Sequence, residues 1–180
     1  KTAYEIRNCD WSSDVCSSDL ALSLLLISAC GDGVTDVSNN DFSASEPFRF
    51  EFGREDRSRF VLDGISGDIT LEATSPDSII IQGERRVESD SQSDALARLA
   101  NLRVEVAETD NEIRVRTEQP SNSRGRNYVV DYSVALPADF VVDIDAVNGE
   151  VSVGSLRSPV LVSSVNGIVS AEDIEASTVG

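Results

Sequence analysis

The C-terminal part of the chain repeats itself at a fixed interval. Residues 142–152 align with residues 160–170, and each copy contains a Val-Asn-Gly triplet. Apolar residues alternate on either side of the triplet, a pattern typical of two short strands joined by a corner. One copy cannot bury its apolar face alone, so consecutive copies are expected to stack. The repeat therefore predicts a parallel β-solenoid, a β-helix-like fold, for this part of the chain.

The residues before the repeat also show the pattern of strands. Phe48, Phe50 and Phe52 alternate with charged residues, and residues 65–71 match residues 147–153 type by type. Similar runs occur at 60–62, 68–72, 79–81, 102–106, 113–116 and 130–136, with Gly or Asx turns between them. Residues 93–101 instead have helical spacing after a Ser or Asp cap. We therefore expect an all-β fold, with an antiparallel or mixed N-terminal section and one short helix before the solenoid.

Asn148, Gly149, Asn166 and Gly167 are expected to form the corners of the repeat. Glycine accommodates a positive φ, and stacked Asn amides can hydrogen-bond from one copy to the next. The alternative interpretation is a binding ledge along the corners. A structural role accounts for all four residues, so we predict corners.

Residues 1–20 do not belong to either pattern. They contain the only Lys, the only Trp and two of the three Cys, and they resemble the two translated halves of a sequencing adapter. We therefore exclude them from reasoning about the fold. The alternative is a natural extension in which Cys9 pairs with Cys16. Because the chain contains no Met and ends as a third copy of the repeat begins, we expect it to be a fragment of a longer protein.

A short apolar segment follows at residues 20–29. It is shorter than the roughly 20 residues that a bilayer span requires and has the length of a signal-peptide core. It ends in Ile27-Ser28-Ala29-Cys30, which resembles the lipobox of bacterial lipoproteins. The resemblance implies cleavage before Cys30, lipid attachment at Cys30 and a flexible tether over residues 30–47. A conventional secretory signal with an incidental Cys is the alternative.

The lipobox resemblance also implies a location. The chain is expected to be extracytoplasmic and lipid-anchored to the cell envelope, with the membrane as a partner through its lipid. In the lipoprotein family, Asp after the anchoring Cys retains the protein at the inner membrane; this chain has Gly31 there, which favours the outer membrane.

The body of the chain resembles one family. The features shared with it are the strand-rich first half with a short helix, Leu136-Pro137 before the repeats, and the Val-Asn-Gly repeats. Together they resemble the putative-adhesin family of β-strand-repeat domains, which is related to the adhesin-head domains of envelope lipoproteins. The resemblance covers about residues 58–180, within an expected domain at 48–180. It implies a β-helix-like fold and an envelope location, and it carries over no catalytic residue.

Composition excludes several classes of function. With 32 acidic and 15 basic side chains, a net charge of −17 and no His, the chain cannot neutralise nucleic-acid phosphates or build the common zinc and Cys-His sites. We expect no cofactor and no metal. The acidic residues Glu108, Asp110 and Glu112 are interpreted as a hairpin tip, with a calcium site as the alternative.

An enzyme is also not expected. Polysaccharide-cleaving β-helix enzymes align carboxylates across neighbouring strands. The acids Asp143, Asp145 and Glu150 do not recur in the next copy of the repeat, where Leu161, Ser163 and Ile168 stand. We predict a non-enzymatic envelope lipoprotein that offers a surface for adhesion, scaffolding or protein interaction, with an envelope protein or a glycan as partner. An envelope-stress sensing module and a carbohydrate-active β-helix protein are the alternatives.

Overall fold

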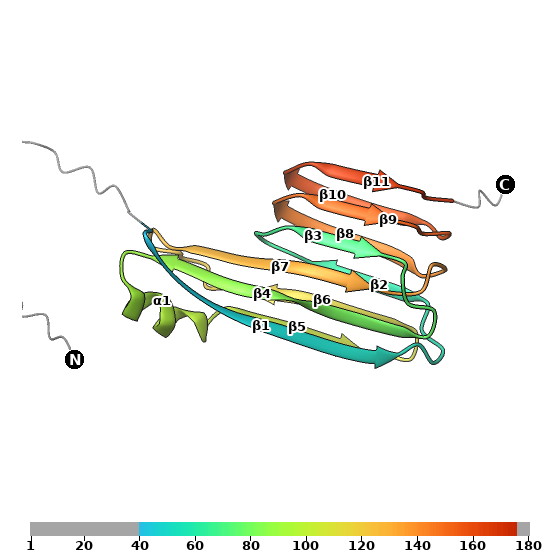
Figure 1. The fold of residues 1–180 in the computed structure, drawn as a ribbon, viewed down its shortest axis with the longest axis horizontal. Helices are drawn as coiled ribbons and strands as arrows, with labels where there is room; N and C mark the ends of the chain where they lie inside the picture. The colour runs from blue at the N-terminus through green and yellow to red at the C-terminus, as the bar shows by residue number, and fades with distance from the viewer. Residues whose placement is uncertain (1–39, 176–180) are drawn as a thin grey trace, which may run out of the picture. The chain divides into compact units, whose positions relative to one another are not determined.

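The computed structural model describes residues 40–175 of the chain. Within them lie eleven strands and one helix (Figure 1). In chain order they are β1 (Phe42–Gly53), β2 (Arg59–Asp63), β3 (Ile69–Glu72), β4 (Ser78–Ser89), α1 (Gln92–Leu99), β5 (Arg103–Glu108), β6 (Glu112–Glu118), β7 (Asn127–Ala135), β8 (Val141–Asn148), β9 (Val151–Gly154), β10 (Val160–Asn166) and β11 (Val169–Glu172). The fold is mostly β with one short helix.

The strands form two mixed sheets that share one core. The six-stranded sheet has the order β1-β4-β7-β3-β9-β11, and the five-stranded sheet has the order β10-β8-β2-β6-β5. Pairing is antiparallel among β1, β4 and β7 and between β5 and β6, and parallel elsewhere. Buried side chains from both sheets belong to one hydrophobic cluster, so the sheets pack face to face.

The prediction of a parallel β-solenoid for the C-terminal part is wrong. The two copies of the repeat do pair in parallel and in register, with Val160 beside Val142 and Val169 beside Val151. However, their strands continue two mixed sheets: β8 pairs with β2, β2 with β6, and β9 with β3. The spacing of a repeat specifies how its copies pair but does not specify which other strands extend the sheets. The antiparallel strands β1, β4, β5, β6 and β7 complete both sheets.

Alternation within the strands builds the core. Phe60 and Leu62 in β2, and Leu71 in β3, are fully buried. The residues of the repeat that pair in register with β2 and β3 are also buried: Val142 and Ile144 in β8, Val151 and Val153 in β9. Each such side chain stabilises the fold by about 1.5–3 kcal/mol relative to an exposed position.

The helix α1 begins after Ser91, whose hydroxyl accepts the backbone N–H of Asp94 at 3.3 Å. Ala95 and Leu99 are buried, and α1 packs against β1 and β4. Leu96, which has helical spacing with Leu99, is 58% exposed. Within residues 40–175, no helix has the length and apolar character needed to cross a membrane.

Two boundaries differ from the expectations. β1 begins at Phe42, so residues 42–47 are the first half of a strand rather than tether. β4 continues to Ser89, well beyond the predicted run at 79–81, because it pairs along its length with both β1 and β7. The expectations for residues 1–20, for the segment at 20–29 and for Cys30 lie outside the described residues.

Candidate functional site

The structure brings the corner residues of the repeat together in a row. Asn148 ends β8 and Asn166 ends β10, and the Nδ2 of Asn166 donates to the Oδ1 of Asn148 at 3.2 Å. Asn148 in turn donates to the Oγ of Ser66 at 3.3 Å. The row therefore runs across three neighbouring corners of the chain, at Ser66, Asn148 and Asn166.

Glycines form a second row beside the first. Gly67 and Gly149 have φ values of 124° and 130°, in the region that favours glycine. A Cβ on Gly149 would lie 2.1 Å from the carbonyl oxygen of Gly67, and one on Gly167 would lie 1.9 Å from that of Gly149. Gly167 is not among the glycines of positive φ, so for it the expectation of a positive φ is wrong. Close approach of the preceding turn, rather than φ, requires glycine at 167.

Carboxylates complete the hydrogen bonding at these corners. The Oδ1 of Asp68 accepts the N–H of Glu150 at 2.9 Å, and the Oδ1 of Asp131 accepts the N–H of Asp68 at 3.0 Å. Sequence analysis singled out neither Asp68 nor Asp131; the match of residues 65–71 to the repeat was the signal that pointed to Asp68. The corner groups therefore bond to one another along the row.

Three of the six acidic residues considered for calcium or catalysis are paired with arginines. Glu108 lies 2.8 Å from Arg57, while Arg59 lies 3.3 Å from Glu112 and 2.9 Å from Asp143. Arg59 of β2 thereby links β6 and β8 on the outer face of the five-stranded sheet. Among residues 40–175 there is no group of three or more His, Cys, Asp or Glu placed to hold a metal ion.

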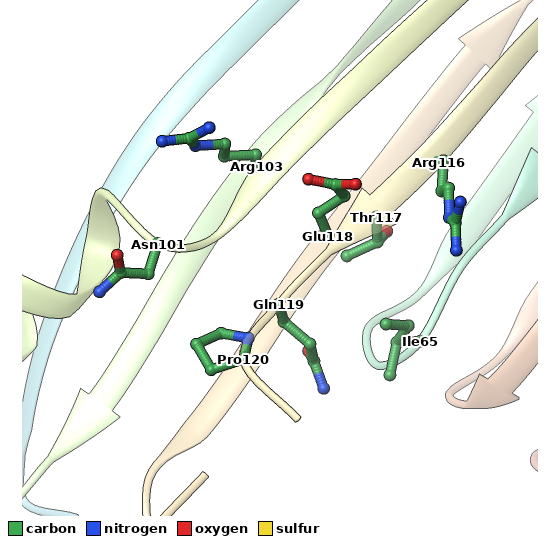
Figure 2. A pocket seen from close by; sticks show the side chains of 8 residues that line it. All are labelled: Ile65, Asn101, Arg103, Arg116, Thr117, Glu118, Gln119 and Pro120. Atoms are coloured by element: carbon green, nitrogen blue, oxygen red, sulfur yellow. The ribbon is translucent and has the colours of Figure 1, made fainter. Parts of the chain in front are cut away.

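A cleft of about 480 Å³ lies near the end of the β5–β6 hairpin (Figure 2). Its walls come from the turn after β2, the segment between α1 and β5, the two hairpin strands and the residues after β6. The lining residues are Ile65, Asn101, Arg103, Arg116, Thr117, Glu118, Gln119 and Pro120. Sequence analysis did not predict this cleft.

The hairpin register places two arginines in this cleft. Arg103 of β5 faces Glu118 of β6, and Glu105 faces Arg116. Arg103 and Arg116 are therefore diagonal neighbours on one face. Their side chains lie on opposite sides of Glu118 (Figure 2). Within the described residues neither guanidinium makes a hydrogen bond or an ion pair with a side chain, whereas most other arginines there do.

Behind the cleft is a buried polar pair. The hydroxyls of Thr117 and Tyr132 lie 2.7 Å apart, and both residues are buried. Burial raises the pKa of Tyr132 to about 12, because the phenolate would lose its hydration. Close to Thr117 in the chain, the Oε1 of Gln119 is buried without a hydrogen-bond partner.

The opposite end of the sandwich carries exposed apolar side chains. β10 and β11 are the last strands of their sheets, at the end away from β1 and β5 (Figure 1). Leu161, Val165 and Ile168 are 64%, 70% and 68% exposed, and Val169 is also exposed. A shallow cleft of about 360 Å³ runs from Val147 and Val165 to Arg116, so it adjoins the cleft lined by Arg103 and Arg116.

Comparison with known proteins gives similar solved structures only. No model of a known protein family matches the chain, and no curated protein does. The chain is similar to a "putative cell adhesion protein" from Clostridium sporogenes (10% identity, TM-score 0.36, 71% of this chain and 59% of that one). It is similar to a "putative adhesin" from Bacteroides fragilis (12% identity, TM-score 0.40, 73% and 55%) and to a "Putative lipid binding protein" from Parabacteroides distasonis (13% identity, TM-score 0.34, 75% and 61%). The chain thus spans 55–61% of the length of these proteins.

Proposed function

We propose that this chain is a non-enzymatic protein-interaction domain that receives an extended segment of a partner protein along β10 and β11. The observation that carries the proposal is the exposed apolar edge. Within the described residues β10 pairs with β8 alone and β11 with β9 alone, so one edge of each is where a further strand, from a partner or from a third copy of the repeat, can add. Addition of a strand to an open sheet edge is a common mode of peptide recognition.

The other end of the sandwich has the protection that open edges usually carry. β1 contains Pro47 and alternates Arg49 with Glu51, and β5 carries Arg103 and Glu105. Charged side chains and proline discourage strands from pairing at an edge. β10, Val160–Asn166, has no charged residue and no proline. The contrast supports an edge that is used for binding.

The charges near this edge favour a basic partner segment. Glu172 ends β11 and Asp173 follows it, and both are exposed without a partner among the described side chains. A second copy of this chain would bring the same acids and a further charge of −17 to the edge, which opposes self-association. The proposed partner segment therefore alternates apolar residues with Lys or Arg.

A synthetic peptide tests the edge. The probe is a short fluorescent peptide, Lys-Val-Arg-Val-Lys-Val-Arg, titrated with the chain while its anisotropy is recorded. Val165→Lys adds a repelling charge on the outer face of β10, and binding should weaken at least tenfold. Leu96→Lys makes the same kind of change on α1, away from the edge, and should leave affinity unchanged.

Two results would overturn the strand-addition proposal. One is equal weakening by Val165→Lys and Leu96→Lys, which would indicate unspecific attraction to an acidic protein. The other is a dimer in sedimentation without peptide that Val165→Lys dissociates, which would show that a second copy occupies the edge.

For location, the proposal keeps the lipid anchor at Cys30 and the outer membrane. It is supported by the apolar segment 20–29 and by Ile27-Ser28-Ala29-Cys30. For the test, a basic N-terminal segment is placed before Leu20, and the chain is expressed in a Gram-negative host fed with labelled palmitate. We expect label in the wild type and in Ser28→Ala, which keeps a small residue before the cleavage site, and none in Cys30→Ser. Export of an unlabelled wild type would indicate a conventional secretory signal.

A further inference from the structure

We propose that the arginine cleft, lined by Arg103, Arg116, Gln119 and their neighbours, binds a small hydroxylated carboxylate of the size of a uronic acid. This site adjoins the shallow cleft that reaches Val165 of β10, but it does not depend on the proposed function. Its volume of about 480 Å³ lies in the range typical of small-molecule sites, about 300–1,000 Å³.

The two guanidinium groups supply recognition of the carboxylate. A guanidinium is planar and presents paired N–H donors that match the two oxygens of a carboxylate. Arg103 and Arg116 line the same cleft from neighbouring strands, on opposite sides of Glu118 in Figure 2, and neither is engaged by a described side chain. Arginines in comparable positions on this sheet, Arg59 and Arg114, are held by two acidic residues each. The free pair is therefore available to a ligand.

The remaining lining is suited to a polyol rather than to a bare anion. Asn101 and Gln119 contribute amides, and Ile65 and Pro120 contribute apolar surface that suits the faces of a sugar ring. The Oε1 of Gln119 is buried with no partner among the described residues, an arrangement that is costly and rare in folded proteins. If the amide turns when the ligand binds, Oε1 can accept a hydrogen bond from a ligand hydroxyl, which offsets that cost.

Glu118 allows a test in which the affinity for the ligand should change in the opposite direction. It also lines the cleft and faces Arg103 in the hairpin register, but it makes no ion pair with either arginine. Its carboxylate repels an anionic ligand at short range, where salt screens little. Removing this charge should strengthen binding, whereas removing either arginine should weaken it.

Isothermal titration of the chain with glucuronate, glucose and sulfate tests the proposal. Glucuronate should bind more tightly than both other probes. Arg103→Gln and Arg116→Gln should each weaken glucuronate binding at least tenfold, and Glu118→Gln should strengthen it about threefold. Arg124→Gln is the matched control, because Arg124 is exposed on a loop outside the cleft. Circular dichroism checks that each variant keeps the β fold.

Three results would overturn the proposal. Equal weakening by Arg124→Gln would show that net charge alone attracts the ligand. Equal affinity for glucose would show that no carboxylate is recognised, and equal affinity for sulfate would show a plain anion site. Loss of glucuronate binding in the Arg103 and Arg116 variants, with peptide binding at β10 unchanged, would support this cleft independently of the strand-addition proposal.

Discussion

Gly149→Ala should destabilise the fold strongly. At φ 130° a residue with a side chain is strained by about 1–3 kcal/mol. The new Cβ would also lie 2.1 Å from the carbonyl oxygen of Gly67, a backbone atom that no side-chain rotation can move away. Relief requires the two turns to separate, which weakens the bonds from Gly67 N to Asn148 O and from Asn148 N to Ile65 O. At about 0.5–1.5 kcal/mol for each bond, the total loss is about 2–6 kcal/mol.

Urea unfolding followed by far-UV circular dichroism measures this loss. For an unfolding slope of about 2 kcal/mol per molar urea, the midpoint should fall by about 1–3 M. Gly154→Ala is the control in the same unit, since its Cβ would meet nothing nearer than the Cγ of Glu72 at 3.9 Å. It should change stability by less than about 1 kcal/mol. A Gly149→Ala midpoint equal to that of Gly154→Ala would refute the argument from close backbone packing.

Three further predictions concern buried and charged side chains. Burial in the folded state raises the pKa of Tyr132 from 10.0 to about 12. The free energy of unfolding should therefore stay constant below pH 10 and fall by about 2–3 kcal/mol up to pH 12. Urea unfolding across that range should show no such fall for Tyr132→Phe. The hydrogen bond from Arg126, and then that from Ser89, lowers the pKa of Asp94, so Asp94→Asn should destabilise at pH 7, and the difference in thermal midpoint should shrink as the pH drops below 3.8. Ile144→Ala should cost about 2–5 kcal/mol in urea unfolding and Val165→Ala, at an exposed site, under about 0.5; equal costs would mean that the repeat is not packed as described.

The sequence predicted the features that depend on neighbouring residues or on the repeat, namely buried positions within strands and the pairing of the two copies. Alternation placed Phe60, Leu62 and Ile144 in the core, and the spacing of the repeat predicted the parallel register of β10 on β8. It did not predict the place of β2 between β6 and β8, because nothing local in Arg59–Asp63 specifies two distant partners. The charged run Glu84-Arg85-Arg86 hid the second half of β4, where pairing with strands on both sides outweighs local preference.

The candidate site was less predictable for the same reason. Arg103 and Arg116 belong to different strands, and only the hairpin register makes them neighbours. The Asp110-Asn111 turn was the available signal for that hairpin, but a turn does not reveal which arginines lack acidic partners. That depends on side chains from other strands: Arg59 and Arg114 are bound by Asp143 and Asp63.

The parallel register of the repeat bears on how the gene can change. Each unit of the repeat gives one strand to each sheet, and its corner bonds to the corner of the unit before it. A tandem duplication of one unit's codons would therefore lengthen both sheets by one strand, about 4.8 Å, and reproduce the same edge at the new end. Deletion of one unit would shorten them equally. Gene copies that differ by whole units would thus encode proteins whose sheets differ in the number of strands but end in the same surface.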